Sequence, residues 1–226
     1  MPPQVEDIAF IYPDRTERAA AAYRKSRPKA RVVCTLSSGD ERTVYVPARV
    51  ARAVAKETPD LPCDIGGLIN WIDAVGRRVC YAALVEMLAQ RDHGESEARD
   101  KLARSGYSPA AIDEAVERAR SSRFLDEERY MRYFIAERLR RGWGRRKIEQ
   151  ELRRKGADPT QLADYPDAFF SEDEDRCRAA ELLRRKPIPD VRPFEKLVRF
   201  LMGRGFSYGV AADAVKARLS EDGDEA

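Results

Sequence analysis

The sequence has little of what metal centres, disulfide frameworks and histidine-dependent active sites require. Its 226 residues include four cysteines without a CxxC pair and a single histidine, His93. A zinc site needs about four nitrogen, sulfur or oxygen ligands, which are usually closely paired in sequence. The scattered cysteines of a chain this long indicate reduced thiols instead of a disulfide framework; they are Cys34, Cys63, Cys80 and Cys177. We therefore expect no metal site and no cofactor.

Long apolar runs and phosphate-binding glycine motifs are also missing. No segment approaches the roughly 20 apolar residues that cross a bilayer, and the N-terminal MPPQVEDIAFIYPDRTER has early acids but no apolar run of signal-peptide length. Neither GxxxxGK[ST] nor a GxGxxG after a strand occurs. His93 lies in RDHGES, a polar stretch between expected helices, and is predicted to be an ordinary surface or turn residue. These absences predict a cytoplasmic protein without catalytic residues.

Charge, in contrast, is abundant. Charged residues make up 36% of the chain and hydrophobic residues 43%. Such a mixture suits amphipathic helices, each with one buried stripe and a wide charged face. The formal net charge is only +3, so an argument for nucleic-acid binding must rest on the local distribution of charge.

The N-terminal third divides into two segments of different character. Residues 1–29 combine prolines, basic residues and a short alanine run, and are predicted to be disordered or peripheral. Within 30–76, the alternating β-branched runs RVVCTL (31–36) and TVYV (43–46) flank a Ser-Ser-Gly-Asp turn, which predicts a β-hairpin. A helical pattern (47–57) and a short helix follow. Because an isolated hairpin is only marginally stable, we expect it to pack against these helices.

From about residue 77 onward the pattern is helical, and it repeats. A leucine followed four residues later by a glycine occurs three times, at Leu102–Gly106, Leu152–Gly156 and Leu201–Gly205. Each leucine is expected to face the core in the last turn of a helix, and each glycine to end that helix in the left-handed conformation. The Ser or Asp two residues later is expected to cap the next helix.

This spacing predicts three repeats of three helices each. The expected helices are 79–91, 95–104 and 108–120 in repeat 1 (77–121), 126–141, 144–155 and 159–170 in repeat 2 (122–170), and 172–185, 191–204 and 207–220 in repeat 3 (171–220). Residues 221–226 are expected to be a disordered acidic tail. Three short helices bury little apolar surface by themselves, so we expect neighbouring repeats to pack against each other. The predicted fold is mostly α: tandem three-helix repeats forming an elongated curved body, with a small N-terminal extension that contains the β-hairpin.

The strongest local signal is a basic cluster between residues 138 and 155. It holds nine Arg and Lys residues against two acids. Ile148 and Leu152 are its main buried stripe, so the helix leaves a broad basic face in solvent. Cations suit the C-terminal end of a helix but not the N-terminal end, where Arg145 to Lys147 lie, and this favours a functional role over a merely solvated face. The candidate partner-binding or DNA-binding residues are Arg138, Arg140, Arg141, Trp143, Arg145, Arg146, Lys147, Arg153, Arg154 and Lys155.

Three other features have both a structural and a functional interpretation. Tyr130, Tyr133 and Phe134 have helical spacing and are predicted to pack in the core, with base stacking as the alternative. Trp143 lies between two glycines and is either a capping core contact or an anchor for a partner. The acidic run 172–175 is predicted to complement a helix dipole instead of binding a divalent cation.

The segment SRFLDEERYMRYFIAERLRRGWGRRKIEQELRRKGAD (122–158) closely resembles the central motif of the bacterial RecX regulatory proteins. The matching features are a Phe-Leu-Asp-Glu opening, an aromatic-rich helix, an Arg-rich Gly-Trp-Gly turn and an Ile-x-x-Glu-Leu helix that ends in Lys-Gly. The resemblance is strong over about 80–158 and weaker to about 220, where PIPDVRPFEK lengthens a link. It implies a tandem array of three-helix units, and some members carry a β-containing N-terminal extension. The first 29 residues have no clear counterpart.

The resemblance also implies a regulator without enzymatic activity. RecX proteins bind the RecA recombinase along the groove of its filament on single-stranded DNA, and usually inhibit its ATPase, strand-exchange and co-protease activities. The implied partners are the RecA filament and, through it, single-stranded DNA, and we expect a monomer. A basic ridge would aid encounter with so anionic a filament. Direct DNA binding through residues 138–155 without RecA, and a helical scaffold for another partner, are the alternatives.

Overall fold

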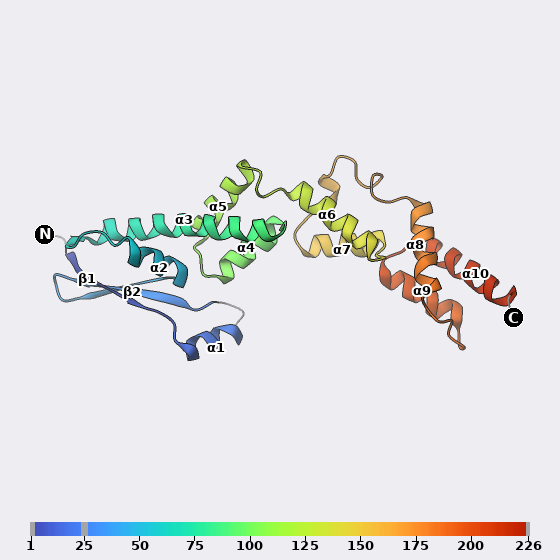
Figure 1. The fold of residues 1–226 in the computed structure, drawn as a ribbon, viewed down its shortest axis with the longest axis horizontal. Helices are drawn as coiled ribbons and strands as arrows, with labels where there is room; N and C mark the ends of the chain where they lie inside the picture. The colour runs from blue at the N-terminus through green and yellow to red at the C-terminus, as the bar shows by residue number, and fades with distance from the viewer. Residues whose placement is uncertain (1–2, 24–26, 225–226) are drawn as a thin grey trace. The chain divides into compact units, whose positions relative to one another are not determined.

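The computed structural model describes residues 3–23 and 27–224, and Figure 1 shows its helices and strands. The chain forms two compact units, residues 1–126 and 127–226. The first contains the strands and α1 to α5, and the second contains α6 to α10. Among the described residues, no helix is both long and apolar enough to cross a membrane.

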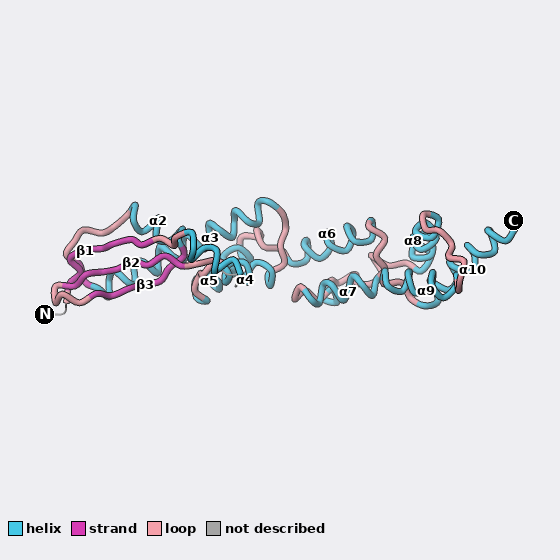
Figure 2. The backbone as a smooth tube through the Cα atoms, turned by 90° about the horizontal axis from the view of Figure 1, so that it is seen from below, coloured by secondary structure: helices cyan, strands magenta, loops and turns pink. Residues whose placement is uncertain are grey.

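The first unit contains a four-stranded antiparallel sheet whose strand order is β3-β2-β1-β4. The predicted hairpin is confirmed as β2 (Lys29–Leu36) and β3 (Glu41–Pro47), in which Val32 pairs with Val44. Val32, Cys34 and Leu36 lie on the inner face of β2, where all three are buried. Figure 2 shows the three longer strands side by side.

The prediction that residues 1–29 are disordered or peripheral is wrong for most of that segment. Strand β1 (Gln4–Ile11) lies inside the sheet between β2 and the short strand β4 (Cys63–Asp64), and helix α1 spans Arg15–Tyr23. Val5 is fully buried, while Ile8 and Phe10 pack against the core. The sequence pattern of this strand is weak because acids interrupt the apolar residues of QVEDIAFI. Strand β1 is stabilised by pairing with β2 and β4, which are distant in sequence. Residues 1–2 and 24–26 lie outside the described residues.

Two helices cover one face of the sheet. Helix α2 (Ala48–Lys56) packs on β2 and on α3 (Ile65–Gln90). The sequence predicted a short helix here and a separate repeat helix at 79–91, with a boundary between residues 76 and 77. The structure joins both into α3, because Gly76 lies in open space and a helical glycine costs only about 1 kcal/mol.

The predicted repeat helices are largely confirmed. Repeat 1 consists of the second half of α3, α4 (Glu95–Arg104) and α5 (Pro109–Ser121). Repeat 2 has α6 (Glu127–Arg140) and α7 (Arg145–Arg154), and repeat 3 has α8 (Glu172–Arg184), α9 (Pro193–Arg204) and α10 (Tyr208–Asp224). The three helix-ending glycines all have positive φ, and Ser108, Asp158 and Ser207 accept the predicted capping bonds.

Two predicted segments differ in the structure. The expected helix 159–170 is instead a single 3₁₀ turn (η1, Pro159–Gln161) followed by turns. Pro166 explains this, because its ring lacks an N–H and clashes with the carbonyl four residues earlier in a helix. The acidic tail 221–226 is helical as far as Asp224, and its last two residues lie outside the described residues.

The buried residues form separate cores. The sheet, α2 and repeat 1 share one core, in which Ile72 and Leu84 are central. Repeat 2 has a core around Ile135, Ile148 and Leu152, and repeat 3 has one around Phe206. Repeat 1 therefore buries its apolar face against the N-terminal sheet, and repeats 2 and 3 lie together in the second unit.

Candidate partner-binding surface

The basic cluster of the sequence forms a helix–turn–helix in repeat 2. Helix α6 ends at Arg140, Gly142 adopts φ +72° in the turn, and α7 begins at Arg145. Ile148 and Leu152 are fully buried, as their spacing predicted. We call the ten candidate residues in this segment the α6–α7 basic surface: Arg138, Arg140, Arg141, Trp143, Arg145, Arg146, Lys147, Arg153, Arg154 and Lys155.

The turn between α6 and α7 is also the joint between repeats 2 and 3. The Gly144 N–H donates to the Arg204 carbonyl at 2.9 Å, and the Arg146 N–H donates to the Gly205 carbonyl at 3.1 Å. A Cβ atom at Gly144 would lie 2.4 Å from the carbonyl carbon of Gly205, so only glycine fits. The two repeats therefore meet backbone to backbone.

This joint reduces the electrostatic cost of placing cations at the start of α7. The first N–H groups of a helix carry partial positive charge, and the last carbonyls carry partial negative charge. Here the carbonyls at the end of α9 accept bonds from the start of α7, so the two dipoles meet head to tail. Arg145 to Lys147 thus lie beside a largely compensated helix end. The dipole argument for their functional role is correspondingly weaker than the sequence suggested.

Trp143 is half-buried and packs against the core of repeat 2. The Arg138 guanidinium lies 4.8 Å from the centre of its ring, and the Lys147 ammonium lies 4.4 Å from it. Cation–π contacts of this kind contribute about 0.5–1 kcal/mol at exposed sites. The structure therefore gives Trp143 a packing role, in which it holds two cations of the surface in place.

Most other cations of the surface pair with an acid on the same helix. Arg145 Nε lies 2.7 Å from Glu149, whose carboxylate also faces Arg153 at 3.5 Å. Arg154 pairs with Glu151 at 2.5 Å, and both Arg138 and Arg141 pair with Glu137. The glutamate side chains of these pairs are only 16–24% exposed, whereas Arg141, Arg145, Arg153 and Arg154 are 45–69% exposed. The guanidinium groups of these four arginines therefore remain open to solvent although their acidic partners are largely covered.

Glu149 is the most constrained of these acids. Burial raises its pKa, but hydrogen bonds from the Tyr165 hydroxyl and Arg145 lower it further, so the net pKa is below the ordinary value. Arg145 also lies 5.5 Å from the centre of the Tyr165 ring and 5.7 Å from that of Phe170. The sequence reasoning missed this aromatic platform because it assigned residues 159–170 to a helix.

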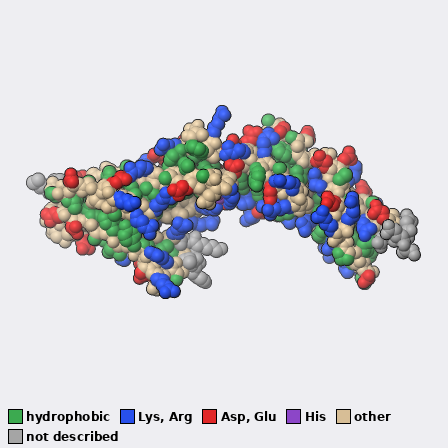
Figure 3. All heavy atoms as spheres, in the orientation of Figure 1, with side chains coloured by type: hydrophobic (Ala, Val, Ile, Leu, Met, Phe, Trp, Pro, Cys, Tyr) green, Lys and Arg blue, Asp and Glu red, His purple; other side chains and the backbone are tan. Residues whose placement is uncertain are grey.

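Arg140 and Arg146 differ from their neighbours. Both side chains are exposed, and neither has an acidic partner within the part of the chain that the structure describes. Packing does not require either cation. Figure 3 shows that Lys and Arg atoms are interleaved with acidic ones over the helices of residues 127–226. The surface is thus a mixed one in which these two arginines are the most available charges.

The aromatic stripe of α6 is only partly buried. Tyr130 and Phe134 pack in the core with their ring centres 6.1 Å apart. The prediction of core packing is wrong for Tyr133, which is 61% exposed because it points away from the face shared by the other two.

The remaining sequence predictions concern metal ligands, the acidic run 172–175 and His93. Among the described residues, no group of three or more His, Cys, Asp or Glu side chains could hold a metal ion. The acidic run forms the first turn of α8 as predicted, and Glu172 and Asp175 pair with Arg176 and Arg178. His93 lies between α3 and α4, as predicted, but the prediction that it is a surface residue is wrong, because it is only 3% exposed. Burial lowers its pKa, as do Arg91 and Lys101.

Comparisons with known proteins identify the repeats. The family models described as the first and second three-helix domains of RecX match residues 80–118 and 126–164. The regulatory protein RecX of Vibrio campbellii is 32% identical over 147 residues, which cover 63% of this chain and 91% of that protein. The regulatory protein RecX of Leptothrix cholodnii is 35% identical over 135 residues, which cover 58% of this chain and 84% of that protein.

Solved structures show the same fold. A crystal structure of a regulatory protein RecX has a TM-score of 0.55 and 17% identity, and the match covers 92% of this chain and 96% of that one. RecX from Lactobacillus salivarius also has a TM-score of 0.55, with 18% identity over 65% of this chain and 98% of its own. From its repeats, its central motif and these relatives, the chain belongs to the RecX family of regulatory proteins.

Proposed function

We propose that this protein binds RecA filaments on single-stranded DNA and inhibits the ATPase, strand-exchange and co-protease activities of RecA. It would thereby regulate homologous recombination, DNA repair and the SOS response in the cytoplasm, as a monomer and without catalysis of its own. Membership of a family of regulatory proteins carries this proposal. The availability of Arg140 and Arg146 supports it, because a nucleoprotein filament is polyanionic and attracts exposed cations.

The test is the ATPase activity of RecA on single-stranded DNA. The protein should suppress ATP hydrolysis at concentrations well below that of RecA, and it should co-sediment with the filaments. The double variant Arg140→Gln/Arg146→Gln should need at least fivefold more protein for the same suppression. Absence of both suppression and co-sedimentation would refute the proposal.

A charge-matched control separates the local effect from that of net charge. Arg42→Gln/Lys56→Gln removes two exposed cations from the first unit and should suppress RecA as the wild type does. If both double variants lose suppression equally, net charge and not the α6–α7 basic surface governs the encounter.

The second candidate function is direct DNA binding through the same surface. It is favoured by the basic excess at 138–155 and predicts binding to single strands without RecA. The logarithm of the binding constant should then fall with the logarithm of salt concentration, with a slope of about −0.7 per phosphate contacted. Neutralising Arg145, Arg146 and Lys147 should weaken this binding equally on all sequences. Fluorescence anisotropy at several salt concentrations measures both effects.

A further inference from the structure

The first unit contains a hollow of about 890 Å³ between its sheet and repeat 1. Its wall is formed by α1, by the residues just before β2, by the end of β3, by α2, by α3, and by α4 with the turn that follows it. This volume lies in the range of ordinary small-molecule sites, which are about 300–1,000 Å³. Every lining residue belongs to the first unit, so the α6–α7 basic surface has no part in it.

The charge of the lining is strongly one-sided. One acid, Glu86, faces six cations, which are Arg18, Arg27, Arg49, Arg52, Lys101 and Arg104. Glu86 is fully engaged by Arg49 in a bidentate pair at 2.6 and 2.7 Å. Lys101 lies 3.3 Å from Glu97, and Arg104 lies 3.5 Å from Asp100, both outside the lining. The remaining three arginines have no acidic partner within the described ranges.

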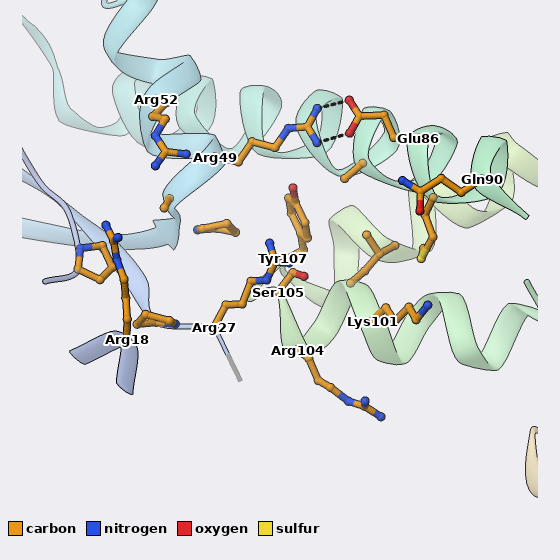
Figure 4. A pocket seen from close by; sticks show the side chains of 17 residues that line it. Arg18, Arg27, Arg49, Arg52, Glu86, Gln90, Lys101, Arg104, Ser105 and Tyr107 are labelled. Carbon is orange, nitrogen blue, oxygen red and sulfur yellow. Dashed lines mark hydrogen bonds and ion pairs between the residues drawn. The ribbon is translucent and has the colours of Figure 1, made fainter. Parts of the chain in front are cut away.

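Arg27 and Arg52, two of these three arginines, have different surroundings. Figure 4 shows the Arg27 side chain extending toward Tyr107 and Ser105, whereas the Arg104 side chain points away from them. The Arg27 N–H donates to the Arg104 carbonyl at 2.8 Å, which fixes the backbone of Arg27 beside the end of α4. Arg52 lies over the Tyr12 ring at 5.8 Å. A concave site with several arginines and no free acid is suited to an anion with more than one oxygen.

The turn after α4 supplies polar groups that are not charged. Gly106 has φ +89°, and a Cβ atom there would lie 3.3 Å from the Lys29 side chain, so the turn sits tightly against the sheet. This places Tyr107, only 8% exposed, with its hydroxyl below the Arg49–Glu86 pair (Figure 4). No hydrogen bond of that hydroxyl occurs in the described part of the chain. Burial raises the pKa of Tyr107, so the hydroxyl stays protonated and can donate.

Most of the remaining lining is apolar, although Gln90 and Ser105 also belong to it. Pro47, Ala48, Ala83, Met87 and Leu102 form an apolar wall. A bare inorganic anion would leave it unused, whereas a planar base would cover it. We propose that this hollow is a nucleotide-binding pocket, in which Arg27, Arg52 and Tyr107 bind the phosphate and the apolar wall carries the base. The nucleotide is either free or a residue of a single strand, since both present the same phosphate ester and base.

Isothermal titration of the full chain tests the pocket. ATP should bind with a stoichiometry of one, and adenosine should bind at least tenfold more weakly because it lacks phosphate. Arg27→Gln/Arg52→Gln should weaken ATP binding at least tenfold, and Tyr107→Phe about threefold. The charge-matched Arg42→Gln/Lys56→Gln, which alters exposed cations outside the lining, should stay within twofold of wild type.

A second titration identifies the source of the nucleotide. An oligothymidylate of eight residues is added to the ATP complex of Arg140→Gln/Arg146→Gln, which removes two cations of the α6–α7 basic surface. Competition assigns the pocket to single strands, and its absence assigns it to free nucleotides. Lack of binding by ATP and oligothymidylate, or pocket variants that match the control, would overturn the proposal. A glutamate octapeptide that binds more tightly than either would also overturn it.

Photo-crosslinking keeps the test independent of variant folding. 8-Azido-ATP should label wild-type peptides that contain residues 47–52 or 83–107, and labelling confined to other segments contradicts the pocket. The pocket variant should still suppress RecA ATPase, because its cations lie outside the α6–α7 basic surface. Failure of the pocket and failure of the proposed regulatory function are therefore separate results.

Discussion

Gly144 and Gly203 show how differently one missing side chain can act. Gly144 abuts the backbone of Gly205, and a Cβ atom there would lie 2.5 Å from both the Gly205 oxygen and the Phe206 nitrogen. Gly203 lies within α9, and a Cβ atom there would have no neighbour within 4 Å. A clash with backbone cannot be relieved by rotating a side chain. At a helical position with open space, an alanine Cβ meets no clash, and alanine has a higher helix propensity than glycine.

We predict opposite effects for the two alanine substitutions. Gly144→Ala should destabilise the second unit by about 1–3 kcal/mol, the usual cost of overpacking. Gly203→Ala should stabilise it by up to about 1 kcal/mol, the difference in helix propensity. Urea unfolding followed by Trp143 fluorescence in a Trp71→Phe background reports on this unit. Equal effects of the two substitutions would show that the Gly144–Gly205 contact does not constrain the joint.

His93 is the residue at which pH should act on stability. Its folded-state pKa lies below 6.5, first because of burial and then because of Arg91 and Lys101, although Glu97 opposes the shift. The unfolded chain therefore binds more protons just below pH 6.5, and stability falls as the pH falls through that value. Glu97, with its pKa lowered to about 2, acts only as the pH falls below about 4.5.

The wild type should thus lose stability of the first unit between pH 7.5 and 5.5. His93→Gln cannot titrate and should lose less over the same interval. Urea unfolding followed by Trp71 fluorescence in a Trp143→Phe background measures the two slopes. Identical slopes would mean that His93 does not contribute to the pH dependence.

At the scale of elements, the repeat depends on how each helix ends. Leu102, Leu152 and Leu201 are buried, and the residue after each helix-ending glycine is also buried, as Tyr107, Ala157 and Phe206 show. The glycine thus reverses the chain and inserts the next side chain into the core. The leucine and glycine spacing predicted the buried leucines and the helix ends, because both are local features, but it did not predict the burial of the residue after the glycine.

The third segment of repeat 2 shows where element prediction failed. Apolar spacing across 159–170 resembles that of a helix, yet Pro166 prevents one. The segment instead places Tyr165, Phe169 and Phe170 in contact with one another and close to Arg132 and Arg145. A proline within an apparent helical pattern was the signal that could have found this platform.

At the scale of the whole molecule, the two units have separate cores. The first core ends at Leu125, and the second unit contains the cores of repeats 2 and 3 together with the Gly144–Gly205 joint. Among the described residues, none belongs to a core of both units. Each unit therefore buries its own apolar surface, which is the main stabilising contribution to folding.

Residues 127–226 should consequently fold when expressed alone. We expect a helical far-ultraviolet circular dichroism spectrum and a cooperative urea transition of Trp143, the one tryptophan in this range. Gly144→Ala should lower the midpoint in the fragment by the same amount as in the full chain. A gradual, non-cooperative loss of signal would mean that the unit needs the first 126 residues.

The sequence by itself determined most of the repeat helices, their caps, the glycine turns and the repeat, because these depend on periodicity and hydrogen bonds over a few residues. It also located the basic cluster and its buried stripe, Ile148 and Leu152. Only the tertiary structure decided the place of β1 in the sheet, the burial of His93, the Gly144–Gly205 joint and the pocket around Tyr107. Each of these depends on groups far apart in the chain, whose meeting no local pattern encodes.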